Sequence, residues 1–128
     1  MANVPQLGTY VSEDNNFVIQ IISANASNGV INAQYKASYS PQGPISVSGD
    51  IGSYAWVTNS QGQTGVAPFH IAFSASVRPE KWPYCTCDMW NGAYQVDNTL
   101  LMDGTRSYVD NKGVIKVQTL GTLKFSQQ

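Results

Sequence analysis

Tyr84-Cys-Thr-Cys-Asp-Met-Trp-Asn-Gly-Ala-Tyr94 is the stretch that decides the fold, because its residue types alternate as they do along a β-strand. Successive side chains of a strand point to opposite faces, so this stretch has one polar and aromatic face and one soft, apolar face. The first face consists of Thr86, Asp88 and Trp90, and the second consists of Cys85, Cys87 and Met89. A hydroxyl, a carboxylate and a large aromatic ring on one face are typical of a small-ligand pocket inside a β-barrel.

The same alternation continues along the chain, and no helical periodicity interrupts it. Clusters of Gly, Pro, Asn and Asp separate the apolar stretches, and one of them predicts a turn at Asp103-Gly104. The expected strands are Gly8–Val11, Phe17–Ile22, Val30–Tyr39, Ile45–Ile51, Phe69–Ala75, Tyr84–Tyr94, Thr99–Met102 and Gly113–Phe125. About eight strands joined by short turns predict an all-β, antiparallel up-and-down meander. We favour a closed eight-stranded barrel over a sandwich, because closure removes the edges that a weakly charged chain protects poorly.

The composition indicates one globular domain over residues 1–128. Only 12% of the residues are charged and the net charge is −1, with the basic residues scattered singly. This distribution disfavours nucleic acid or an acidic membrane surface as a partner. The apolar runs are also too short to cross a bilayer. The N-terminal Met-Ala-Asn-Val-Pro has no signal-peptide pattern, which leaves cytoplasmic location and secretion with a removed signal both open.

No catalytic or metal-binding arrangement is visible in the sequence. His70 is the only histidine, so it cannot build a metal site with other histidines. No spacing supports a Ser-His-Asp triad around it. We therefore expect a binding protein that is not an enzyme and needs no cofactor or metal.

Cys85 and Cys87 lie two positions apart, which places their Cα atoms roughly 6.5 Å apart on a strand. That separation is near the upper limit for a disulfide. We favour two small apolar side chains on a packed face, and a disulfide between subunits is the next interpretation. Because this face is apolar, we expect a homo-oligomer, either a dimer or a tetramer.

Several short patterns follow one another along nearly the whole chain. They are Gly8-Thr-Tyr10, Gly29-Val-Ile-Asn-Ala-Gln-Tyr35, Val47-Ser-Gly49, Phe69-His-Ile-Ala-Phe73, Trp90-Asn-Gly-Ala-Tyr94, Leu100-Leu-Met-Asp-Gly-Thr105 and Leu120-Gly-Thr-Leu-Lys-Phe125. In their order and spacing these patterns resemble the avidin and streptavidin family, whose members are eight-stranded barrels that bind biotin. The resemblance implies a divergent avidin-like barrel with biotin as the first candidate ligand.

The resemblance also implies a set of ligand-binding residues at one end of the barrel. Ser12, Asn16 and Tyr35 would lie near the ureido oxygen, and Thr122 stands where the family has a carboxylate near a ureido nitrogen. Phe73 and Trp90 would form aromatic walls, with Asp88 near the ligand sulfur. Ser38 would lie on the closing loop and Leu101 on the pocket wall.

The chain departs from the family at two of the four aromatic walls. Thr99 stands where the family has a tryptophan before the Leu-Leu pair, and no tryptophan occurs near Ile115. Each large ring buries about 150–250 Å², which is worth several kcal/mol at roughly 25 cal/mol per Å². The resemblance therefore supports the fold more strongly than the ligand.

Two other functions stay open. Trp56 and Trp82 lie in or beside loops, where exposed aromatic rings suit a carbohydrate-binding lectin on a similar scaffold. An interaction protein whose barrel is filled by its own side chains is the other alternative, and it predicts no cavity.

Overall fold

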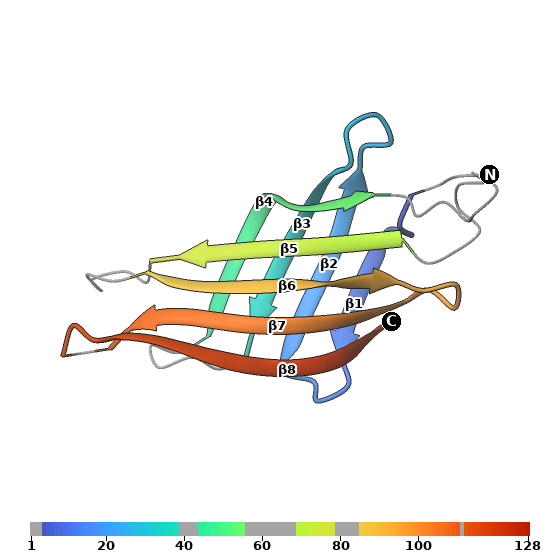
Figure 1. Ribbon diagram of the computed structural model, residues 1–128. Helices are drawn as coiled ribbons and strands as arrows, with labels where there is room; N and C mark the ends of the chain where they lie inside the picture. Colours follow the sequence, from blue (N-terminus) through green and yellow to red (C-terminus); the bar gives the residue numbers. More distant parts are fainter. Residues whose placement is uncertain (1–3, 39–43, 56–68, 79–84, 111) are drawn as a thin grey trace.

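The computed structural model describes residues 4–38, 44–55, 69–78, 85–110 and 112–128. Its strands are β1 (Gly8–Ser12), β2 (Phe17–Ala24), β3 (Val30–Ala37), β4 (Ile45–Ala55), β5 (Phe69–Val77), β6 (Thr86–Tyr94), β7 (Thr99–Val109) and β8 (Ile115–Gln127). Each strand pairs antiparallel with the next, and β8 pairs with β1 (Figure 1). The predicted fold class, an all-β eight-stranded antiparallel meander barrel, is thus confirmed. Within the described residues, no helix is long and apolar enough to pass through a membrane.

The alternation predicted for β6 is also confirmed. Thr86, Asp88 and Trp90 are buried inside the barrel, whereas Cys85 and Met89 are exposed and Cys87 is half-buried. Both cysteines are free thiols. Trp56 and Trp82, on which the lectin interpretation rests, lie outside the described residues.

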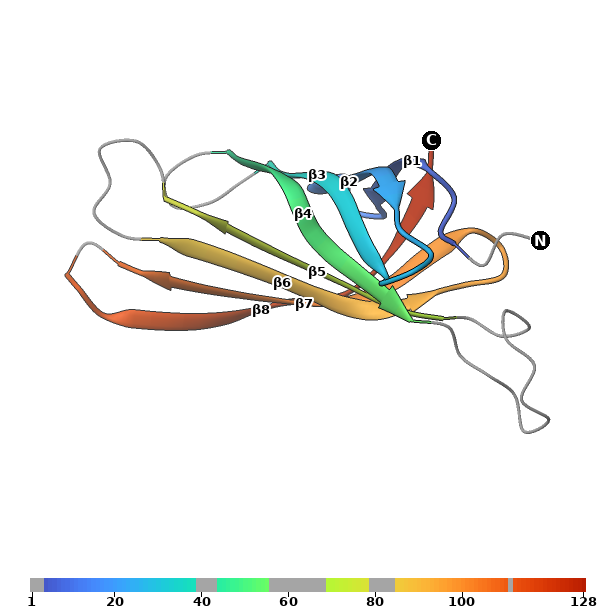
Figure 2. The ribbon, with the colours of Figure 1, turned by 90° about the horizontal axis from the view of Figure 1, so that it is seen from above.

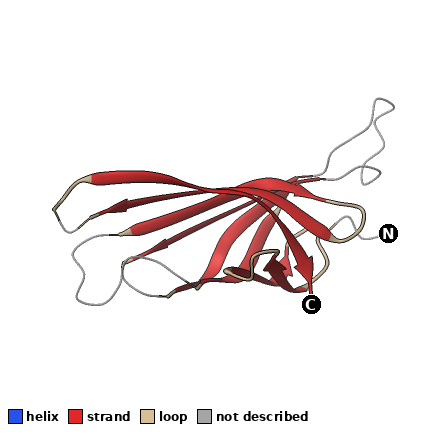
Figure 3. Ribbon diagram, turned by 90° about the horizontal axis from the view of Figure 1, so that it is seen from below, coloured by secondary structure: helices blue, strands red, loops and turns tan. Residues whose placement is uncertain are grey.

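Two short seams divide the closed barrel into two sheets, β1–β4 and β5–β8. β4 pairs with β5 only over Gly52–Ala55, and β1 pairs with β8 only over Tyr10–Ser12. β1 and β2 also pair only over Gly8–Val11, whereas the pairing between the other strands is longer; β7 and β8, for example, pair from Thr99 to Val109. Figures 2 and 3 show the consequence, because β6, β7 and β8 extend well beyond the region in which the barrel is closed.

The turn predicted at Asp103-Gly104 is wrong, because β7 continues through it to Val109. Gly104 faces the interior opposite Trp90 in the β6–β7 register. A Cβ atom at position 104 would lie only 2.5 Å from Cζ3 of the indole. The glycine therefore makes room for the ring, and no turn is needed to explain it.

The centre of the core is built around the Trp90 ring. Phe17 and Phe125 meet the indole edge to face, with ring centroids 4.9 and 5.2 Å away. All three aromatic side chains are buried. Rings from β2, β6 and β8 thus pack together across both sheets, which fixes the position of Trp90.

We predict that Gly104→Ala destabilises the protein by about 1–3 kcal/mol, because the added methyl group overlaps the indole and the packed core cannot relax freely. Urea unfolding followed by circular dichroism measures the change. Thr105→Ala is the matched control, since Thr105 is exposed on the adjacent position of β7; its effect should stay within about 0.5 kcal/mol. Equal stability of Gly104→Ala and the parent protein would contradict the packing described here.

Candidate functional site

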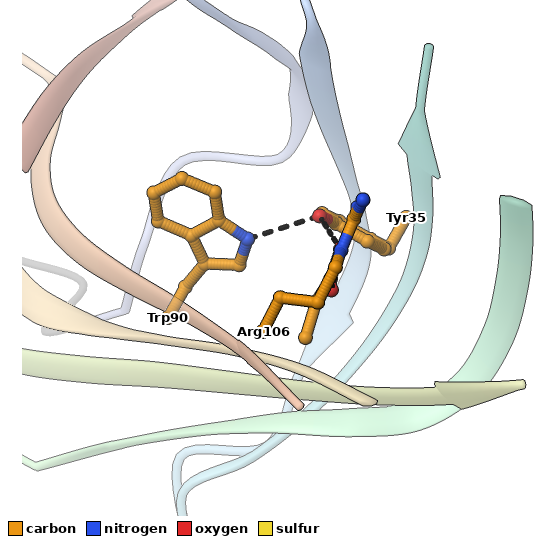
Figure 4. Close-up of polar contacts among 4 residues, drawn as sticks. Tyr35, Trp90 and Arg106 are labelled. Carbon is orange, nitrogen blue, oxygen red and sulfur yellow. Dashed lines mark hydrogen bonds and ion pairs between the residues drawn. The ribbon is translucent and has the colours of Figure 1, made fainter. Parts of the chain in front are cut away.

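A buried network of four side chains occupies the barrel interior (Figure 4). The Arg106 guanidinium forms two bonds with the Asp88 carboxylate, Nε to Oδ1 at 2.6 Å and Nη2 to Oδ2 at 2.8 Å. The Tyr35 hydroxyl donates to Oδ2 of Asp88 at 2.6 Å, and Nε1–H of Trp90 donates to the Tyr35 oxygen at 3.0 Å. None of the four side chains is more than 1% exposed.

Strand pairing brings these residues together from distant parts of the sequence. Asp88 on β6 stands directly opposite Arg106 on β7, and Trp90 stands opposite Gly104 on the same pair of strands. Tyr35 reaches the pair from β3, on the other sheet. The network therefore ties the two sheets together through the interior of the barrel.

The Asp88 carboxylate is compensated within the network. A buried carboxylate is costly unless it is paired and hydrogen-bonded, and Asp88 has a two-point ion pair plus a hydroxyl donor. Burial, followed by the nearby negative charge of Asp88 and the hydrogen bond to it, raises the pKa of Tyr35 far above its ordinary value. Tyr35 therefore stays protonated and keeps donating to Asp88 at every physiological pH.

Three of the residues predicted for the site, Tyr35, Asp88 and Trp90, lie together in this network, but Arg106 was not predicted. The sequence reasoning missed it because the strand was expected to end at Met102, before the Asp-Gly pair. One signal could have revealed it: Arg106 is in phase with the apolar positions Leu100 and Met102 if the strand continues.

Ser12, Asn16 and Ser38 lie around the turn between β1 and β2. The Ser12 hydroxyl donates to Oδ1 of Asp14 at 2.6 Å and accepts the Phe17 N–H at 3.0 Å. Partial burial would raise the pKa of Asp14, but hydrogen bonds from Ser12 and Asn16 outweigh it and lower that pKa. The Asn16 carbonyl accepts the Ser38 N–H at 2.7 Å. The bonds of Ser12 thus stabilise the turn and do not connect it to the Asp88 network.

Leu101 and Thr122 lie on the outer face of the sheet, away from the interior. Leu101 is 41% exposed, and its inward neighbour Leu100 is fully buried. Thr122 is exposed and its hydroxyl donates to Oδ1 of Asp103 at 3.3 Å. The resemblance implies Leu101 on the pocket wall and Thr122 near a ureido nitrogen. Neither residue faces the barrel interior.

A groove with a volume of about 250 Å³ opens on the side of the barrel, where β4, β5 and β6 meet. Its lining combines two buried aromatic rings with a polar rim. The lining residues are Asp50, Ile51, Gly52, Ser53, Ala72, Phe73, Ser74, Met89, Trp90 and Asn91. The remaining predicted wall residue, Phe73, thus joins Trp90 at this groove, whereas Tyr35 and Asp88 do not line it.

The groove forms where the β4–β5 seam ends. The last pair of the seam is Gly52 with Phe73, and the strands are unpaired beyond it. A Cβ atom on Gly52 would lie 2.6 Å from the Phe73 ring, so only glycine lets the ring approach β4 this closely. A bulge in the β3–β4 pairing between Ile31 and Ala33 shifts the register just before this point. Bulges of this kind bend a strand away from its neighbour.

No known protein family, curated protein or solved structure matches this chain. The closed eight-stranded barrel is consistent with an avidin-like fold but is not specific to it. Within the described ranges, no group of three or more His, Cys, Asp or Glu side chains could hold a metal ion.

We predict that Arg106→Met lowers the free energy of unfolding by about 3–5 kcal/mol, because it leaves the Asp88 carboxylate buried without its cation. The double variant Asp88→Asn/Arg106→Met removes both charges and keeps an acceptor for Tyr35. It should therefore be more stable than Arg106→Met alone in urea unfolding. The single variant Asp88→Asn completes the cycle. If the loss of unfolding free energy in the double variant equals the sum of the losses in the two single variants, the pair is not coupled.

We also predict that stability falls as the pH rises above about 10. Burial raises the pKa of both Tyr10 and Tyr35 in the folded state, while the same groups in the unfolded chain ionise near 10. The unfolded state then loses protons that the folded state retains, so each tyrosine lowers stability by about 1.4 kcal/mol per pH unit. Urea midpoints between pH 8 and 11.5 measure the slope. Tyr10→Phe should flatten it, and an unchanged slope would contradict this assignment.

Proposed function

We propose that this protein is a non-catalytic binding protein that takes a small molecule in the side groove, above Phe73 and Trp90. The observation that carries the proposal is a groove of about 250 Å³ with these two aromatic rings in its lining. Concave, mostly apolar sites with a few polar groups are typical of small-molecule binding.

The rigidity of Trp90 supports this role. Its indole N–H is held by Tyr35, and its ring is fixed by Phe17, Phe125 and the close approach of Gly104. A wall that is already ordered in the free protein loses little conformational entropy when a ligand binds. The buried network would thus serve binding indirectly, by presenting one ring in a fixed position.

Biotin is the first candidate ligand, on the strength of the resemblance to avidins. Two of the contacts that the resemblance implies are engaged inside the barrel, because Asp88 pairs with Arg106 and Tyr35 donates to Asp88. Biotin would instead place its uncharged ring system in the groove, above Phe73 and Trp90, and leave its carboxylate in solvent. The seryl hydroxyls and the Asn91 amide on the rim could then bond to the ureido group.

We further propose that the protein forms a homodimer or homotetramer through the outer face of the long sheet. Ile115 and Val117 expose 74% and 72% of their surface on that face. Their partners on β7, Val109 and Ser107, are uncharged. Association through this patch buries apolar surface, and the charged Asp103 lies farther along the same face.

An interaction protein with a filled barrel is the second candidate. It is favoured by the complete burial of the Asp88–Arg106 pair, which occupies the interior where an avidin-like ligand would lie. In this case the groove would hold no small ligand, and the outer face would carry the function.

Calorimetric titration with biotin tests the first proposal, and we expect saturable binding that Ser74→Phe abolishes. Ser74 is exposed on the groove rim, so the new ring would fill the groove without disturbing the core. Ser76→Phe is the matched control, because Ser76 is the next outward residue of β5, is also exposed and does not line the groove. No heat at millimolar biotin would remove biotin as the ligand. Equal binding by the two variants would remove the groove as its site.

A further inference from the structure

The groove opens sideways, between two strands, and this decides how a ligand enters. β4 and β5 separate beyond the Gly52–Phe73 pair, and Figure 1 shows β4 running away from β5 on this side of the seam. The rim residues Ser53, Ser74 and Met89 are exposed on the outer surface. A ligand can therefore enter the groove above Phe73 and Trp90 from the side, without passing through either end of the barrel.

Among the described residues that line the groove, Asp50 is the only one with an ionisable side chain, so their charge is negative. The Asn32 amide donates to Oδ1 of Asp50 at 2.9 Å and holds the carboxylate at the rim. Among the described residues, Asp50 takes part in no ion pair. The rim thus offers an uncompensated negative charge to whatever enters.

The rest of the groove lining is largely apolar. Phe73 and Trp90 form a packed base under it and are only 2% and 1% exposed. The neighbouring Met89 and Ile51 supply further apolar contact. The volume of about 250 Å³ corresponds to roughly eight water molecules at about 30 Å³ each, which fits one ring with a short chain.

We infer that the side groove binds a small molecule with an apolar, ring-containing body and a cationic head. The body lies against Met89 and Ile51, above the packed rings of Phe73 and Trp90, and the cation pairs with Asp50 at the rim. This inference rests on the proposed function and adds to it the chemical class of the ligand. We therefore expect the affinity of the groove to be highest for an amine or ammonium compound, lower for an uncharged compound and lowest for a carboxylate.

Three probes of matched shape test the ranking: 3-phenylpropylammonium, 3-phenylpropan-1-ol and 3-phenylpropanoate. Chemical-shift titrations at neutral pH and low salt give their dissociation constants, which we expect in the millimolar range for ligands of this size. The cation should bind about three- to fivefold more tightly than the alcohol, as an exposed ion pair allows, and the carboxylate should bind most weakly. The spread should shrink at high salt, because the pair at the rim is screened.

Asp50→Asn removes the charge and keeps the acceptor oxygen that Asn32 bonds. It should bring the three dissociation constants together. Asp103→Asn is the matched control, because Asp103 is an exposed carboxylate on the outer face of β7 and does not line the groove. This variant should preserve the ranking of the probes.

The outcomes separate the two proposals. If none of the probes binds, or if Ser74→Phe leaves their binding intact, the groove is not a ligand site and the proposed function fails with it. If all three bind equally, or if Asp50→Asn keeps the ranking, the groove stands as a site and the cationic class is wrong. Both proposals are supported if the three probes bind in the expected order, Asp50→Asn removes that order and Asp103→Asn keeps it.

Discussion

The ion pair between Asp88 and Arg106 is the interaction on which the rest of the structure depends. Two opposite charges with no solvent contact are stable only as a pair with good geometry, and here two short hydrogen bonds provide it. Tyr35 bonds to the same carboxylate from the opposite sheet and accepts the indole N–H of Trp90, which fixes the position of that ring. The pair therefore fixes the interior, the contact between the sheets and one wall of the groove.

The way in which the barrel closes explains why a groove exists beside so well packed a core. The seam between β4 and β5 is four residues long, whereas the strands within each sheet pair over most of their length. Beyond this seam the paired backbones of β4 and β5 diverge, and the network bridges the two sheets on that side, where Asp88 pairs with Ala75 and Tyr35 with Val47. Space for a ligand thus arises at the edge of the closed region, and the interior stays filled.

The sequence predicted correctly which side chains of a strand face inward, because this depends only on local alternation. It placed Asp88 and Trp90 on the inner face of β6 and Met89 on the outer face, because the period of a strand is independent of its partners. Arg106 was missed because an Asp-Gly pair is also a turn signal, and only the contact between Gly104 and Trp90 shows why the strand continues. Leu101 was placed by its position in a family-like pattern, and the alternation of β7 puts its neighbour Leu100 inside instead. The groove depends on where pairing between β4 and β5 stops, a long-range register that no local pattern encodes.

The central claim is that a ligand binds beside the locked network and does not displace it. Hydrogen exchange of the Arg106 side-chain Nε–H, followed by NMR together with the Met89 methyl signal during titration with 3-phenylpropylammonium, tests this most directly. We expect the Met89 signal to shift while Arg106 Nε–H stays protected, since Met89 lines the groove and Arg106 bonds to Asp88 behind it. Loss of that protection on ligand binding would mean that the ligand enters the interior, and would contradict the account.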